Sequence, residues 1–111
     1  FSNGASMTFR AGVESSDLIS AIAPVSGYLF VDHPKPSKAI YLLLIAGDKD
    51  PINPLDGGVI TNFFFNTKPQ SKLPMVNSVK KWLPLIDLTE AAKKTRVIKG
   101  AKEFAYGPNK Q

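Results

Sequence analysis

Residues 39–47, AIYLLLIAG, form the most apolar stretch of the chain and decide its fold class. Lys38 precedes this stretch and the charged sequence GDKD (47–50) follows it, so the apolar run is bounded on both sides. The run is too short to cross a bilayer, which needs about 20 apolar residues. A short uncharged run of this kind predicts a buried central strand of a parallel sheet.

The stretch LISAIAPVSG (18–27) predicts a second strand, because it is short, apolar, rich in β-branched residues and ended by a glycine. Such a composition suits a strand that is buried on both faces. Apolar residues at helical spacing predict a helix before it, in ASMTFRAGVES (5–15). Strands that alternate with helices indicate an α/β protein with a parallel sheet.

The second half of the chain is less regular. Prolines and glycines predict a long loop over residues 51–73, and we interpret Phe63, Phe64 and Phe65 within it either as a pocket wall or as ordinary packing. A helix is expected from about Pro74 until Pro84 ends or kinks it. RVIKG and EFAYG, near the C-terminus, are candidates for further strands.

The composition limits the classes of function. The chain has 111 residues, enough for one small domain, and no cysteine, so it holds no disulfide and no thiolate metal site. Its net charge is +5, but only the lysines and arginine between residues 93 and 102 cluster. No RNA- or DNA-binding motif accompanies them, so we interpret them as a solvated basic surface and expect no nucleic-acid partner. We also expect no membrane span.

The chain opens FSNGASMTFR (1–10), which places a serine directly before the first predicted helix. A serine on a tight turn between a strand and a helix is the nucleophile elbow, G-x-S-x-G, of which Phe1, Ser2, Asn3 and Gly4 match the later part. Gly4 would let the backbone turn sharply, and the N–H of Asn3 would help to bind an oxyanion. The alternative is that Ser2 is an ordinary helix N-cap.

Three motifs in order resemble the polyhydroxybutyrate depolymerase and feruloyl esterase branch of the α/β-hydrolases. The branch has G-x-S-N-G-[GA]-x-M at its elbow, A-x-A-P-V-[SA]-G on the next strand and H-G-x-x-D-x-x-[VI]-P-Y-x-G-G after the following one. A helix with a tryptophan comes later. The resemblance covers roughly residues 1–88. The matching residues are Ser2, Asn3, Gly4, Ala5, Met7, Phe9, Arg10, Ala21, Ala23, Pro24, Val25, Ser26, Gly27, Gly47, Asp50, Pro54, Gly57, Gly58 and Trp82.

The resemblance implies an α/β-hydrolase fold and a role for several residues. Ser2 is the implied nucleophile, Asp50 the triad acid that orients the histidine, the Asn3 N–H an oxyanion donor and Gly4 the elbow glycine. Asp48 is the rival acid, and Asp56 is interpreted as a loop residue. Ala46 and Leu55 stand where the branch has histidine and tyrosine, and the cysteines common in the branch are absent.

The third member of the triad is missing from the expected place. The histidine of an α/β-hydrolase follows the acid, but no histidine follows Asp50, and His33 precedes it in a Pro-rich loop. We interpret His33 as a loop residue. Residues 1–111 are therefore expected to be a partial catalytic domain, from the elbow to before the histidine segment, with the C-terminal part of the parallel sheet and its flanking helices. Alone they are expected to be inactive or nearly so.

The resemblance implies a hydrolase of carboxylic esters that works through an acyl-enzyme, with no metal and no cofactor. Its substrates would be polyhydroxyalkanoates, feruloylated or acetylated plant polysaccharides, or small esters, and its location extracellular. Two alternatives stay open. One is a serine peptidase of the prolyl-oligopeptidase type on the same fold, and the other is a non-catalytic, hydrolase-like binding module.

Overall fold

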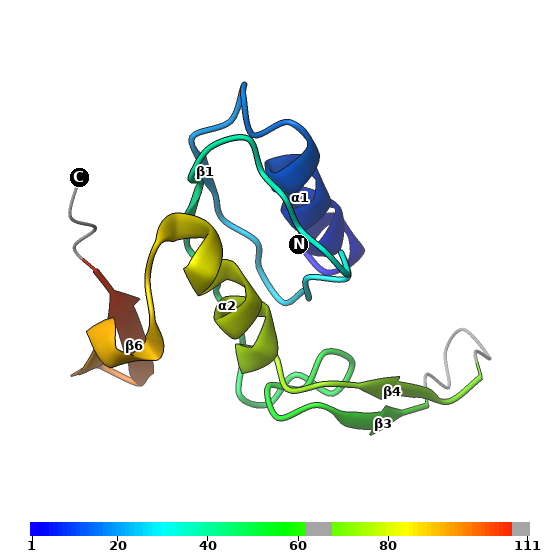
Figure 1. The fold of residues 1–111 in the computed structure, drawn as a ribbon. Coiled ribbons are helices and arrows are strands. Elements are labelled where there is room, and N and C mark those ends of the chain that lie inside the picture. The colour runs from blue at the N-terminus through cyan, green and yellow to red at the C-terminus, as the bar shows by residue number, and fades with distance from the viewer. Residues whose placement is uncertain (62–67, 108–111) are drawn as a thin grey trace.

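The computed structural model describes residues 1–61 and 68–107. In Figure 1 the helices lie beside the parallel strands, and a hairpin extends from each side of this body. In chain order the elements are α1 (Asn3–Glu14), β1 (Ala21–Ile22), β2 (Tyr41–Leu42), β3 (Gly58–Ile60), β4 (Gln70–Lys72), α2 (Val76–Trp82), the 3-10 helices η1 (Leu83–Ile86) and η2 (Glu90–Ala92), β5 (Lys93–Ile98) and β6 (Ala101–Tyr106).

The two most apolar stretches pair as parallel strands, as expected. β1 lies beside β2, and the pairing resumes at a bridge between Val25 and Ile45. Pro24 explains the interruption, because the register directs the missing N–H of this residue toward β2. The Pro24 carbonyl still accepts the N–H of Ile45 at 3.1 Å, so the two stretches stay together beyond the proline.

Burial alternates along β2, contrary to the expectation of strands covered on both faces. Ile40, just before β2, is fully buried, whereas Tyr41, Leu43 and Ile45 are about half exposed or more. Successive side chains of a strand point to opposite faces, and in the described part of the chain both helices cover the face toward which Ile40 points. The expectation of double burial was wrong because an apolar run alone does not say how many faces are covered.

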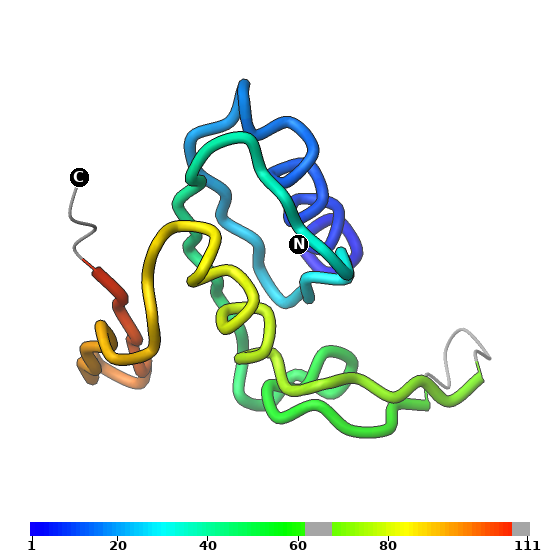
Figure 2. Tube along the Cα trace, in the orientation of Figure 1, coloured from blue at the N-terminus to red at the C-terminus, as the bar shows by residue number. Residues whose placement is uncertain are grey.

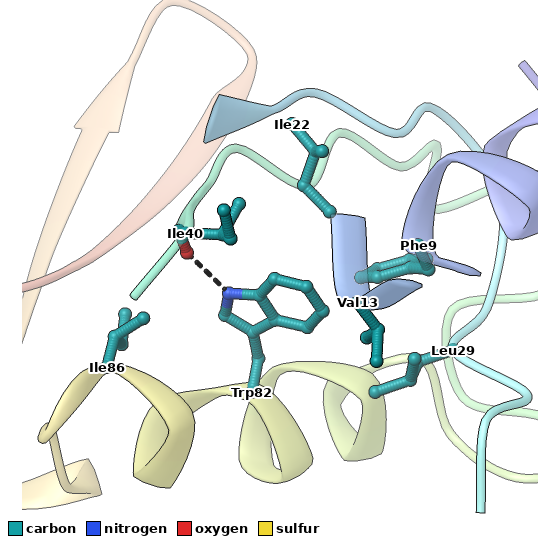
Figure 3. Packing of buried hydrophobic residues seen from close by; sticks show 7 residues of the cluster. All are labelled: Phe9, Val13, Ile22, Leu29, Ile40, Trp82 and Ile86. Atoms are coloured by element: carbon teal, nitrogen blue, oxygen red, sulfur yellow. Dashed lines mark hydrogen bonds between the residues drawn. The ribbon is translucent and has the colours of Figure 1, made fainter. Parts of the chain in front are cut away.

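Trp82, at the end of α2, is the centre of the core (Figure 3). Its indole N–H donates to the Ile40 carbonyl at 2.8 Å, and its ring meets Phe9 of α1 edge-on, with centroids 5.7 Å apart. One side chain thus joins α2 both to the strand pair and to α1. The two predicted helices are confirmed, and α2 gives way to a 3-10 turn at Pro84 as the proline predicts.

Residues 51–73 do not form one long loop, which corrects the sequence-based expectation. β3 and β4 pair antiparallel, with Gly58 opposite Lys72. Gly57 lets the two segments approach at the open end of this hairpin, because it has a φ of 72° and a Cβ there would collide with the Lys72 carbonyl oxygen. The predicted pocket wall of Phe63, Phe64 and Phe65 lies outside the described residues.

The two C-terminal candidate strands are present as β5 and β6, but they pair antiparallel with each other. Gly100, at a φ of 75°, lies in their short turn. Along the tube of Figure 2, this hairpin and the β3–β4 hairpin lie on opposite sides of α2. The described residues therefore form one parallel and two antiparallel strand pairs. The larger parallel sheet of an α/β-hydrolase stays a prediction.

We predict that Trp82→Phe lowers the free energy of unfolding by about 2–3 kcal/mol, because it leaves the buried Ile40 carbonyl without its donor and opens a cavity. Urea denaturation measures the change. Phe30→Leu is the control, since Phe30 is 65% exposed. A loss for Trp82→Phe no larger than that of the control would contradict the central position of the indole.

Candidate active site

Ser2 adopts a backbone conformation that side chains rarely tolerate. Its φ is 54° and its ψ is −121°, close to the first central position of a type II′ turn, which glycine normally occupies. Such a residue stores about 1–3 kcal/mol of strain and persists only where its surroundings hold it. A nucleophile elbow holds its serine in such a strained conformation directly before a helix, as Ser2 stands directly before α1.

Hydrogen bonds on both sides hold Ser2 in this conformation. Its N–H donates to the Val25 carbonyl at 2.9 Å, and its carbonyl accepts the N–H of Ala5 at 2.9 Å. The side chain makes no capping hydrogen bond to α1. An N-cap hydrogen bond therefore does not explain the strain, and the Ser2 hydroxyl is not engaged in capping α1.

The closest approach at this turn falls on Gly27 rather than on Gly4. A Cβ on Gly27 would lie 2.5 Å from the Cβ of Ala5 and 2.9 Å from the Ser2 carbonyl oxygen. A Cβ on Gly4 would meet no atom within 4 Å, and its φ is not in the left-handed region. Among the described residues, neither a left-handed φ nor a close contact thus requires glycine at position 4, whereas a close contact requires it at position 27.

The strand pairing brings Ser2 and Asp50 to the same edge. Ser2 bonds to Val25 on one side of the β1 stretch, and Ser26 donates its N–H to the Ile45 carbonyl on the other side at 2.8 Å. The order across this edge is therefore Ser2, then Val25–Ser26, then Ile45. Asp50 follows Ile45 after a short turn. In open parallel sheets, functional groups gather at this carboxyl end of the strands.

Asp50 is held as a carboxylate by several donors. Its Oδ1 accepts the N–H groups of Asn53 at 2.8 Å and Ile52 at 2.9 Å. The hydrogen bond from the Asn53 N–H is the main cause that lowers the pKa of Asp50; the Ile52 N–H, the Ser26 hydroxyl and the charge of Lys72 add to it, while burial opposes it. Asp50 is thus fixed in position and ionised.

The loop after Asp50 is anchored by residues from two other segments. The Tyr28 hydroxyl donates to the Pro54 carbonyl at 2.7 Å. Lys72 donates to the Ile52 carbonyl at 3.0 Å and to the side-chain oxygen of Asn53 at 2.6 Å. Burial is the main cause that raises the pKa of Tyr28, and Asp50 adds to it.

The other candidate residues lie in different surroundings. Asp48 and Asp56 are exposed, and none of the hydrogen bonds that hold Asp50 reach them. Asn3 begins α1, so its N–H has no acceptor within the helix, as an oxyanion donor requires. His33 lines a hollow with Glu14 at the far end of α1, about 18 Å along a helix of 12 residues. His33 therefore does not lie beside Ser2.

Sequence analysis did not identify Ser26, Tyr28 or Lys72 as members of the site. Ser26 is buried, has a φ of 51°, and its hydroxyl lowers the pKa of the Asp50 carboxyl. Its signal was its place between the APV stretch and Gly27, a strand end followed by a glycine. Lys72 had no such signal, because only the β3–β4 pairing brings it to Asp50.

No family model matches this chain, and neither a curated protein nor a solved structure similar to it is found. In residues 1–61 and 68–107, no three carboxylate or imidazole side chains lie together as a metal site requires. Within the same part of the chain, neither helix has the length and hydropathy needed to cross a bilayer.

We predict that Gly27→Ala and Gly4→Ala differ sharply. The first places a methyl group against Ala5 and the Ser2 carbonyl, and overpacking of this kind costs about 1–3 kcal/mol. The second meets open space within a helix, where alanine is about 1 kcal/mol more favourable than glycine. Thermal or urea denaturation of both variants tests this. Equal stability of the two would show that the close approach at Gly27 is not maintained in solution.

We also predict that the ionisation of Asp50 makes the free energy of unfolding depend on pH in the acid range. The pKa of its carboxyl is lower in the folded state than in the unfolded state, so its contribution is present above the unfolded value and is lost as the pH falls through the folded one. The free energy of unfolding of the wild type should therefore fall more steeply than that of Asp50→Asn between about pH 5 and pH 2.

Urea denaturation at a series of pH values measures this difference. Asp48→Asn is the control, because it removes the same charge from an exposed turn without these hydrogen bonds. Parallel curves for Asp50→Asn and the wild type would mean that the carboxylate is not held in this way.

Proposed function

We propose that the chain carries the nucleophile and the acid of a serine hydrolase that acts on carboxylic esters, with an α/β-hydrolase fold. The observation that supports this most is the conformation of Ser2: a strained serine, with a hydroxyl that does not cap its helix, at the carboxyl end of parallel strands. The ionised Asp50 at the same edge supports it further.

In this proposal the Ser2 hydroxyl attacks the ester carbonyl, and the N–H of Asn3 binds the oxyanion that forms. The serine oxygen–carbon bond forms while the alkoxide leaving group departs with a proton, and water then hydrolyses the acyl-enzyme. A histidine outside these 111 residues takes the serine proton and returns it to the leaving group. Asp50 fixes the tautomer of that histidine and stabilises its charged form.

The substrate class in this proposal is a polyhydroxyalkanoate, a feruloylated or acetylated polysaccharide, or a small ester, met outside the cell. These details rest on the resemblance of the three motifs. A peptide bond is the competing substrate, because the same serine chemistry cleaves it on the same fold.

A non-catalytic binding module is the second candidate. The observation that favours it is that the one histidine of the chain, His33, lies at the far end of α1 from Ser2. Without a base, a serine is a weak nucleophile at neutral pH.

We predict that a fluorophosphonate probe labels the protein, expressed from the longest open reading frame that contains this chain, and that Ser2→Ala abolishes the labelling. Activation of the hydroxyl by a triad is the reason, and mass spectrometry of the labelled peptide locates the adduct. Ser71→Ala is the control, since Ser71 is an exposed serine of β4.

Ester and peptide substrates, tested on the unlabelled protein, then separate the two hydrolase classes. If a folded wild type is not labelled at Ser2, the triad is not assembled and the binding module becomes the better explanation.

A further inference from the structure

We propose that Lys72 is a positioning residue for the candidate acid: its ammonium group holds the loop that carries Asp50. This inference rests on the proposed function, since it gives Asp50 the part of the acid. It assigns a role to the β3–β4 hairpin, which the sequence did not predict.

Lys72 and Asp50 form hydrogen bonds to the same two residues, Ile52 and Asn53. Its Nζ donates to the Ile52 carbonyl at 3.0 Å and to the Asn53 Oδ1 at 2.6 Å. The N–H groups of Ile52 and Asn53 donate in turn to the Asp50 carboxylate. Lys72 thus binds the acceptor oxygens of Ile52 and Asn53, while Asp50 binds the N–H groups of the same two residues. A movement of either residue would break a hydrogen bond to Lys72 or to Asp50.

The position of Lys72 is itself fixed. The hairpin register sets it opposite Gly58, and Gly57 packs against its carbonyl at a distance that excludes any Cβ. The ammonium also lies 5.2 Å from the centroid of the Tyr28 ring, a cation–π contact. Since the Tyr28 hydroxyl donates to the Pro54 carbonyl, this pair of side chains holds the loop at one further point.

The charges around the carboxylate agree with this arrangement. The ammonium of Lys72 lies over the Tyr28 ring, and the charge of Asp50 acts on both side chains, while Asp48 and Lys49 lie exposed in the turn before the acid. Burial lowers the pKa of Lys72, and the charge of Asp50 opposes this change. The ammonium in turn favours the ionised form of Asp50.

The test compares Lys72→Met, Lys72→Gln and Lys72→Arg with Lys49→Met, which removes the same charge from the exposed neighbouring turn. The carboxyl signal of Asp50, assigned with Asp50→Asn, is titrated by 13C NMR in each variant of the same full-length protein. The rate of fluorophosphonate labelling at Ser2 is measured from pH 5 to 9 in parallel. Lys72→Gln decides the result if Lys72→Met does not fold.

We expect the loss of charge in Lys72→Met and Lys72→Gln to raise the pKa of Asp50 by about half a unit or more. Labelling should slow about tenfold, with its pH profile displaced to lower pH, because a misplaced Asp50 no longer holds the base in position and stabilises its charged form less. Lys72→Arg should recover part of both. If the Asp50 titration and the labelling profile of Lys72→Gln match those of Lys49→Met, the proposal is wrong.

The NMR titration separates this inference from the proposed function, because it needs no activity. A wild type that is not labelled would remove the hydrolase proposal, while a pKa difference between Lys72→Gln and Lys49→Met would still show that the ammonium acts on Asp50.

Discussion

The backbone of Val25, Ser26 and Gly27 makes the contacts on which both halves of the candidate site depend. The Val25 carbonyl holds the N–H of Ser2 on one side, and the Ser26 N–H holds the Ile45 carbonyl on the other. Gly27 then allows the first turn of α1 to pack directly against the strand end. The nucleophile candidate and the acid candidate therefore share one rigid segment, although 47 residues lie between Ser2 and Asp50 in the sequence.

The strain at Ser2 has a physical counterpart in this packing. A side chain at a φ of 54° and a ψ of −121° costs about 1–3 kcal/mol, and two hydrogen bonds and the close contact with Gly27 offset that cost. The core supports these contacts, because Phe9 of α1 packs edge-on against Trp82 and the Trp82 indole donates a hydrogen bond to the Ile40 carbonyl. Ser2 is thus linked through α1 and Trp82 to the strand that leads to Asp50.

Hydrophobic periodicity was sufficient to locate the helices and the parallel pair. Both helices and the two most apolar strands were predicted close to their observed positions, because each carries its own pattern. The β3–β4 hairpin was missed, since strands of three residues beside prolines and glycines have no period to detect. The parallel arrangement did not extend to β5 and β6, because residues 96–107 suit a hairpin as well as separate strands and only tertiary pairing decides between them.

The candidate site likewise contains residues that the sequence predicted and residues that only the structure brings together. Ser2 and Asp50 were chosen from motifs, which record spacing along the chain, whereas Tyr28 and Lys72 act through contacts between segments that no spacing encodes. Ser26 lies between these cases. Its backbone leaves the strand with a φ of 51°, at the residue after the last parallel bridge, and its hydroxyl lowers the pKa of Asp50.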